Sequence, residues 1–221
     1  MIQFIPLALA LTIGASAAAT PAIAPGTYTY AASSSGSSVG TSVVTVAANG
    51  ADTVISEKGS GTAQGQSGNA ADTLTLGADL APTAYQLSGT VGARSLNGSA
   101  TFANNTATVT GLNGTKSFDL LGSTKHFIVI DLGVLAGFIA LPAQMAAWND
   151  TAALAVIPSY GTSIPIAPDA SLKPARPATV ASGDTALAFG GQIPFTIWYN
   201  PRTYVTDEID VPAQSLTVIR K

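Results

Sequence analysis

The sequence of 221 residues contains no cysteine, one histidine and few charged residues, which make up only 10% of the chain. Without cysteine there is no thiol nucleophile, no cysteine-ligated zinc site and no disulfide framework. The single histidine, His126, is not accompanied by a Gly-x-Ser-x-Gly motif, so a serine hydrolase has no sequence support. We therefore assign no catalytic residue and expect His126 to be a solvated residue at the end of a strand.

Basic residues are also scarce. Nine Lys and Arg are scattered along the chain, and the net charge is -3. A nucleic-acid partner is excluded on this ground, because phosphate recognition needs a clustered positive surface. The densest acidic run is Asp207, Glu208 and Asp210, which does not match a calcium-binding loop. We interpret it as a solvated hairpin arm and predict no metal and no cofactor.

Long apolar runs are limited to two, and the first covers residues 4–13. Small residues follow it, with two candidate cleavage sites at Ala15-Ser16-Ala17 and Ala22-Ile23-Ala24. This pattern predicts a signal peptide over residues 1–24 and an exported protein, periplasmic or extracellular, although no Lys or Arg precedes the apolar run. The alternative is an uncleaved anchor or a first core element. Residues 25–221 are long enough for a single domain.

The second apolar run extends from Phe127 to Trp148. It predicts a short strand that leads into a helix near residues 132–148, with Asp131 as the helix N-cap. A helix that is apolar on all sides is either buried or within a membrane. Asp131, Pro142 and Gln144 interrupt the run, so we favour a buried helix over a membrane span and expect membrane contact to be peripheral at most.

The rest of the chain has the pattern of short antiparallel strands. Three Asn-Gly pairs predict two-residue hairpin turns, at Asn49-Gly50, Asn97-Gly98 and Asn113-Gly114, and Asn104-Asn105 predicts a further turn. Thr and Val on alternate positions between these turns suit a pleated surface. The first half is therefore predicted to be an antiparallel meander.

Strand patterns return after the apolar run. They cover residues 152–157 and 163–167, a hairpin with arms at 193–199 and 204–211, and a closing strand at 215–220. Together with the first half, this predicts a mostly β protein of about a dozen strands with one main helix.

Three segments together carry a family resemblance: Val129-Ile130-Asp131 before an apolar helix, Trp198-Tyr199-Asn200 before a turn, and the closing Val211–Arg220. They resemble uncharacterised exported bacterial proteins whose fold is similar to the lipoprotein-localisation carriers, over about half of the chain. The resemblance implies a curved antiparallel half-barrel whose concave face is filled by a helix. Family members often carry polar residues soon after the aspartate, whereas residues 132–135 are apolar here.

These observations predict a non-enzymatic binding protein that holds a hydrophobic small molecule, a lipid or an envelope protein on the concave face. The candidate lining residues are Phe138, Leu141, Met145, Trp148, Phe195, Ile197 and Trp198. The same residues also fit a purely structural core. The alternative function is a secreted structural or adhesive β domain without a pocket. An enzyme that uses Glu57 and Asp131 to act on glycans is a more distant alternative.

Overall fold

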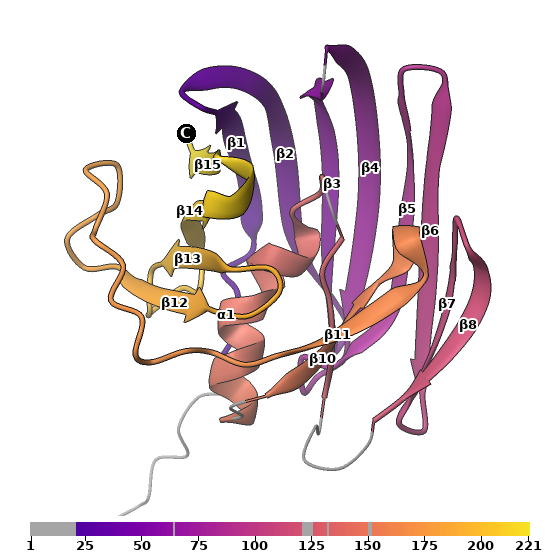
Figure 1. Cartoon of the computed structure of the whole chain (residues 1–221). Helices are drawn as coiled ribbons and strands as arrows, with labels where there is room; N and C mark the ends of the chain where they lie inside the picture. Colours follow the sequence, from indigo (N-terminus) through magenta and orange to yellow (C-terminus); the bar gives the residue numbers. More distant parts are fainter. Residues whose placement is uncertain (1–20, 64, 121–125, 132, 150–151) are drawn as a thin grey trace, which may run out of the picture.

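A computed structural model describes residues 21–63, 65–120, 126–131, 133–149 and 152–221 (Figure 1). One large sheet contains most of the strands, a smaller sheet lies across its concave side, and one α-helix lies beside the smaller sheet. The strands of the large sheet are β1 (Gly26–Ser34), β2 (Ser37–Asn49), β3 (Asp52–Ala63), β4 (Gln66–Leu76), β5 (Pro82–Val91), β6 (Arg94–Ala103), β7 (Thr106–Gly111), β8 (Gly114–Asp119), β12 (Thr185–Phe189), β13 (Phe195–Tyr199), β14 (Thr206–Val211) and β15 (Leu216–Arg220).

The large sheet is antiparallel, and its strand order is β12-β13-β14-β15-β1-β2-β3-β4-β5-β6-β7-β8. The last strand of the chain pairs with the first, with Tyr30 opposite Arg220. The sheet is open and curves around the helix (Figure 1). We call the side that faces the helix the inner face and the opposite side the outer face. The predicted fold, a mostly β protein with a curved antiparallel sheet and one helix on its concave face, is confirmed.

The smaller sheet contains β9 (Phe127–Val129), β10 (Ala153–Ile157) and β11 (Thr162–Ile166). Strands β9 and β10 are parallel, and the helix α1 (Ala136–Trp148) connects them as a βαβ unit. Strands near these positions were expected from the sequence, but a second sheet was not. Helix and sheet approach closely at Gly137, where a Cβ would lie 2.0 Å from the Val129 carbonyl oxygen.

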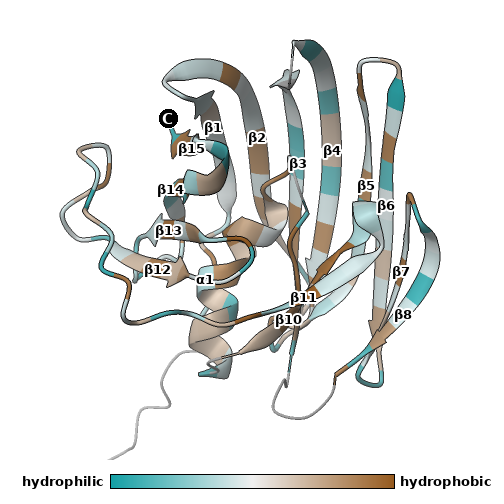
Figure 2. Ribbon diagram, viewed as in Figure 1, coloured by the Kyte–Doolittle hydropathy of each residue, from teal (hydrophilic) through white to brown (hydrophobic). Residues whose placement is uncertain are grey.

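The core lies between α1, β9, β10 and the inner face of the large sheet. Residues Ala136 to Met145 of α1 are all buried, and Figure 2 shows this helix in mainly apolar colours. Gln144, the polar side chain in this stretch, donates from Nε2 to the Leu80 carbonyl oxygen at 2.9 Å. Among the residues that the structure describes, no helix is long and apolar enough to cross a membrane.

The predicted turns divide into three cases. Asn104 and Asn105 have φ of 50° and 62° and form the turn between β6 and β7, as predicted. Asn49-Gly50 and Asn113-Gly114 flank turns, although the residues between the paired strands are Gly50-Ala51 and Leu112-Asn113. The prediction for Asn97-Gly98 is wrong, because both residues lie inside β6 and Gly98 pairs with Leu87.

Gly98 serves packing instead of a turn. The 3-10 turn η1 (Pro158–Tyr160) crosses the inner face of β6 and β7 at Gly98 and Gly111. A Cβ at Gly98 would lie 2.9 Å from the Ser159 nitrogen, and one at Gly111 would lie 2.0 Å from the Pro158 carbonyl oxygen. The absence of a side chain at these two positions lets η1 dock directly on the sheet.

The predicted helix N-cap is also wrong. Helix α1 begins at Ala136, Leu135 occupies the N-cap position, and no side chain of the N-cap residue caps the helix. Asp131 instead accepts hydrogen bonds from the Ser159 amide, at 2.9 Å, and from the Ser159 hydroxyl. The Leu135 amide donates to Glu57 on β3. The acceptor for an amide at the start of α1 is therefore Glu57, from a distant strand, and not Asp131, which precedes the helix in the chain.

The packed domain begins before residue 25. Ile23 is 4% exposed and belongs to the hydrophobic core, and the Ala24 amide donates to the Thr203 carbonyl oxygen at 2.8 Å. The Tyr28 hydroxyl donates to the Ala24 carbonyl oxygen at 2.7 Å. Residues 23 and 24 therefore contact the folded domain, and the signal peptide over residues 1–24 stays a prediction.

Candidate functional site

The predicted pocket-lining residues lie mostly in the core. Phe138 packs edge-on against Phe195 with ring centroids 5.3 Å apart, and Phe195 stacks on Phe189 at 4.6 Å. Leu141, Met145 and Ile197 are buried in the same cluster. These side chains pack against one another in the core. Their contact with a ligand stays a prediction.

The two tryptophans of that set differ: Trp148 packs against the edge of this cluster, whereas Trp198 lies outside it. Trp148, at the end of α1, is half-buried, stacks on His126 with centroids 4.2 Å apart and donates to the Asp79 carbonyl oxygen at 2.7 Å. Trp198 pairs with Glu208 and faces the outer side, because alternate residues of β13 point to opposite faces. It is therefore separated by the sheet from Phe195 and Ile197.

A strap, residues 167–184, covers Trp198. The Arg176 guanidinium lies 5.4 Å from the Trp198 ring centroid and donates to the carbonyl oxygens of Ala181 and Asp184. Thr179 donates to Glu208, which lies on the same outer face. Burial and the neighbouring Asp207 raise the pKa of Asp184 to about 6. The strap thus closes the outer face of β13 and β14 over a polar, acidic layer.

A second acidic group lies on the inner face. Glu57 on β3 and Asp72 on β4 are each 2% exposed and pair across the strands, and Tyr85 on β5 is 1% exposed. Asp131, which follows β9, is also 2% exposed. Glu57 and Asp131, the residues of the distant enzyme alternative, both act electrostatically on Asp72 and so belong to one buried group.

Burial controls the protonation of this inner group. Burial first and the neighbouring Glu57 carboxylate second raise the pKa of Asp72 to about 9. Burial also raises the pKa of Glu57, although its hydrogen bonds, including that from the Leu135 amide, oppose the shift. At neutral pH we infer that Asp72 is protonated, since two adjacent buried carboxylates do not both ionise at low cost.

The inner group holds layers together and is closed to solvent. Glu57 joins the sheet to the start of α1, and Asp131 joins the β9–α1 connection to η1. Within the described part of the chain, no group of three or more His, Asp or Glu residues is placed to hold a metal ion. A substrate would have to pass through the sheet or the helix layer to reach these carboxyls, so the geometry supports a structural role.

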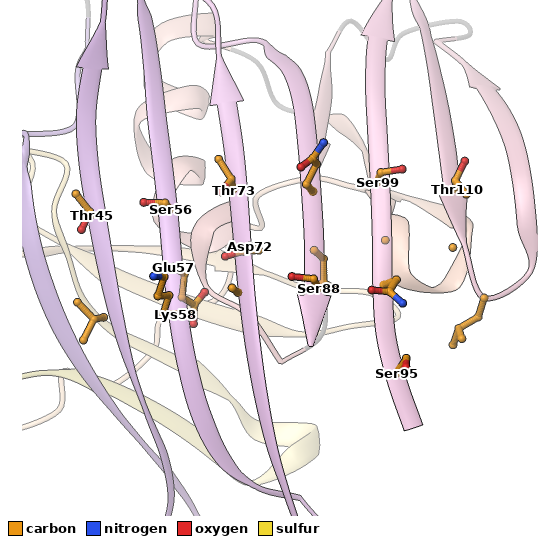
Figure 3. Close-up of a pocket in the computed structure, with 18 residues that line it drawn as sticks. Thr45, Ser56, Glu57, Lys58, Asp72, Thr73, Ser88, Ser95, Ser99 and Thr110 are labelled. Atoms are coloured by element: carbon orange, nitrogen blue, oxygen red, sulfur yellow. The ribbon is translucent and has the colours of Figure 1, made fainter. Parts of the chain in front are cut away.

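A solvent-open hollow occurs on the outer face of the large sheet, across β2 to β7. We call it the outer trough, and it has a volume of ≈ 830 Å³. Figure 3 shows Thr45 on β2, Ser56 on β3, Thr73 on β4, Ser99 on β6 and Thr110 on β7 along it. The full lining consists of Val43, Thr45, Ser56, Glu57, Lys58, Ala71, Asp72, Thr73, Gln86, Leu87, Ser88, Ser95, Asn97, Gly98, Ser99, Thr110, Gly111 and Leu112.

Strand alternation divides this lining into two sets. Glu57 and Asp72 direct their side chains to the inner face, where they are buried, and border the outer trough from within the sheet. Hydroxyls and amides face the solvent, with Lys58 as the lining residue that adds an exposed charge. Val43, 44% exposed, and Leu112, 64% exposed, provide apolar contact toward opposite ends. The surface is therefore polar and nearly neutral.

Neither Asp72 nor the outer trough is among the candidate residues and sites predicted from the sequence. For Asp72 a signal was present, since it shares strand parity with Leu74 and Leu76, which predicts a buried face. Ile55 and Glu57 share parity in the same way. For the outer trough no local signal exists, because its residues come from six strands and read individually as a solvated sheet surface.

Comparison with known proteins adds a fold relationship. No protein-family model and no curated protein matches the chain. A crystal structure described as a beta-barrel-like protein of the domain of unknown function DUF1849 from Brucella abortus is similar, with a TM-score of 0.51 and 10% sequence identity. The similarity covers 90% of this chain and 96% of that chain.

This likeness shows the fold alone. The chain shares the β-barrel-like architecture of that bacterial protein of unknown function, which agrees with part of the resemblance found in the sequence. Similarity to the lipoprotein-localisation carriers stays a prediction.

Proposed function

We propose that the protein is an exported, non-enzymatic binding domain that holds an extended ligand or an envelope partner in the outer trough. The observation that carries this proposal is the trough itself, a hollow of ≈ 830 Å³ lined by hydroxyls and amides. These groups stand on paired strands, so their positions are fixed before a ligand arrives. Prearranged hydrogen-bonding groups reduce the ordering cost of binding.

The outer trough supports binding better than the inner face does. A hydrophobic ligand on the inner face, as the sequence suggested, would have to displace Leu141 and Ile197, both 0% exposed. Close packing makes such a displacement costly, because the helix layer would have to separate from the sheet. The outer trough needs no rearrangement to admit a ligand.

Export is supported by the apolar run at residues 4–13 and the small residues that follow it. Of the two candidate cleavage sites, the one after Ala17 is favoured, because cleavage after Ala24 would remove Ile23 from the core. We expect protein recovered from the exported fraction to begin at Ala18. Amino-terminal sequencing checks this, and an intact Met1 on protein retained in the cytoplasm would contradict export.

The binding proposal is tested with a wedge in the outer trough. Ser88 is exposed in the lining, and Ser88→Trp should block the hollow without disturbing the core. Thr108→Trp is the matched control, since Thr108 is exposed on the outer face but lies outside the lining. Isotope-labelled protein is titrated with a soluble neutral glucan, a polyanionic glycan and lysophospholipid micelles, and amide chemical shifts are recorded.

We expect at least one probe to shift the amides of β2 to β7, the wedge variant to lose the response and the control to keep it. A probe that instead shifts only α1 and the inner-face residues would overturn the choice of face. A wild-type protein that responds to none of the probes would overturn the binding function.

A further inference from the structure

One row of side chains crosses the outer face from β1 to β8. The strand registers place these residues opposite one another in sequence across the sheet, one from each strand. All of them carry a hydroxyl or an amide: Thr27, Thr45, Ser56, Thr73, Gln86, Ser99, Thr110 and Thr115. We call this set the polar row.

The neighbouring rows of the same face are mixed. On one side, Val43 and Ala71 interrupt the row that includes Lys58 and Ser88. On the other side, Val54 and Ala84 interrupt the row that includes Thr75. A sheet face can be solvated with apolar residues scattered over all of its rows. Solvation alone therefore does not explain why one row is entirely polar while both neighbouring rows contain apolar residues.

The polar row and the outer trough coincide. The six members on β2 to β7, from Thr45 to Thr110, all belong to the lining. Figure 3 shows labelled members of the row side by side across the strands. Two independent features, the strand register and the shape of the surface, therefore mark the same line of residues.

The chemistry of the row favours a hydroxyl-rich ligand. Each Thr or Ser hydroxyl both donates and accepts, as does the Gln86 amide group. Neighbouring strands lie roughly 4.8 Å apart, so the row offers hydrogen-bonding groups at a regular interval. A linear polymer with polar groups on every unit can meet such a row along its length.

The charges and the location exclude other classes of ligand. A polyanion such as nucleic acid needs clustered cations, whereas Lys58 is the exposed cation in the lining. A peptide strand binds by pairing with a free sheet edge, and the outer trough lies on a face between paired strands. A lipid needs a continuous apolar surface, and Val43 and Leu112 lie at separate ends.

We infer that the outer trough takes a linear, neutral polysaccharide that lies across the strands along the polar row. The inference rests on the proposed binding function and specifies its ligand. The glycan is held but not cleaved, since Glu57 and Asp72 direct their carboxyls to the buried inner face. Affinity comes from many weak hydrogen bonds, because no aromatic ring lines the outer trough among the residues described.

The test compares two triple variants built on the same three strands. The row variant is Thr73→Val, Ser99→Ala and Thr110→Val. The control variant is Thr75→Val, Thr101→Val and Thr108→Val, whose residues lie on the outer face but outside the lining. Affinity electrophoresis measures retardation by a neutral linear glucan and by alginate as the polyanion, and the titration with lysophospholipid micelles is repeated by chemical shift.

We expect the neutral glucan to retard the wild-type protein. The row variant should lose affinity by at least about tenfold, because each hydroxyl removed costs a hydrogen bond. The control variant should stay within about twofold of the wild type, since its hydroxyls are not part of the row. Equal loss in both variants would show that the row has no special role and would overturn the inference.

Two further outcomes separate this inference from the proposed function. In the first outcome, alginate or lipid binds in the outer trough, Ser88→Trp blocks this binding, and no neutral glucan binds. This would overturn the neutral polysaccharide as the ligand and leave the proposed binding function in place. Failure of every probe to bind in the outer trough would overturn both.

Discussion

The two faces of strands β2 to β7 differ in how they use polar residues. On the inner face Glu57 and Asp72 are almost completely buried. Glu57 accepts a hydrogen bond from the Leu135 amide at the start of α1, and Asp72 lies beside Glu57 on the next strand. On the outer face their chain neighbours Ser56 and Thr73 are half-buried in an open hollow. A shift of one residue along the strand thus changes the role of a polar side chain from structural to available for binding.

The difference has an energetic side. A buried carboxylate reduces stability unless it is well compensated, and Asp72 lies in a closed group with Glu57, Tyr85 and Asp131, in which burial and the nearby Glu57 carboxylate disfavour its charged form. A hydroxyl on the outer face keeps access to water and costs little. Substitutions should therefore have large, pH-dependent effects on the inner face and small effects on the outer face.

The largest effect is expected at Asp72. Its pKa is about 9 in the folded protein against an ordinary 3.8, so the folded protein keeps a proton that the unfolded chain releases. The free energy of unfolding should fall as the pH rises between these values, by up to about 4 kcal/mol between about pH 5 and about pH 8. Asp72→Asn should remove most of this dependence and stabilise the protein at about pH 8.

Urea unfolding at both pH values measures the effect. Thr73→Val, the adjacent residue on the outer face, is the matched control and should keep the wild-type pH dependence. The same slope in Asp72→Asn as in the wild type would show that Asp72 is not the group that retains the proton.

A large but pH-independent effect is expected at Gly111. In Gly111→Ala the new Cβ would collide with the Pro158 carbonyl oxygen, so η1 must move away from the sheet. The loss in the free energy of unfolding should be about 3 kcal/mol, as for other overpacked sites. Chemical denaturation measures it, and Gly111→Ala as stable as the wild type would mean that η1 does not dock there.

The smallest effect is expected on the outer face. Thr110→Val, next to Gly111 in the chain but exposed in the outer trough, should change the free energy of unfolding by less than about 0.5 kcal/mol. The same denaturation experiment applies. A loss similar to that of Gly111→Ala would remove the distinction between the faces and would make the polar row a structural feature.

The sequence predicts the architecture because local signals agree with it. Alternation along the strands, the hairpin with Phe195–Tyr199 as its first strand and the Asn104-Asn105 turn each depend on neighbours in the chain. Asn97-Gly98 shows the limit of such signals, since the same pair suits a turn or a close backbone contact. Only the docking of η1, which is distant in sequence, decides between them.

The site was less predictable for the same reason. Asp131 reads locally as a helix N-cap, yet Ser159 takes its carboxylate and Glu57 accepts from the helix instead. Trp198 reads as an anchor for a hydrophobic ligand, yet Arg176 from the strap covers it. The polar row requires the register of every strand from β1 to β8, and one chain pattern does not provide registers between strands.

The pairing of β1 with β15 has a consequence for how the molecule forms. Most neighbouring strands of the large sheet are also consecutive in the chain, so their hairpins close over short loops. The joint between Tyr30 and Arg220 instead unites the two ends of the described chain. Closing so long a loop is slow, so we expect β15 to pair with β1 late in folding. Until it does, β1 remains an unpaired sheet edge, and the lifetime of this folding intermediate depends on how fast β15 docks.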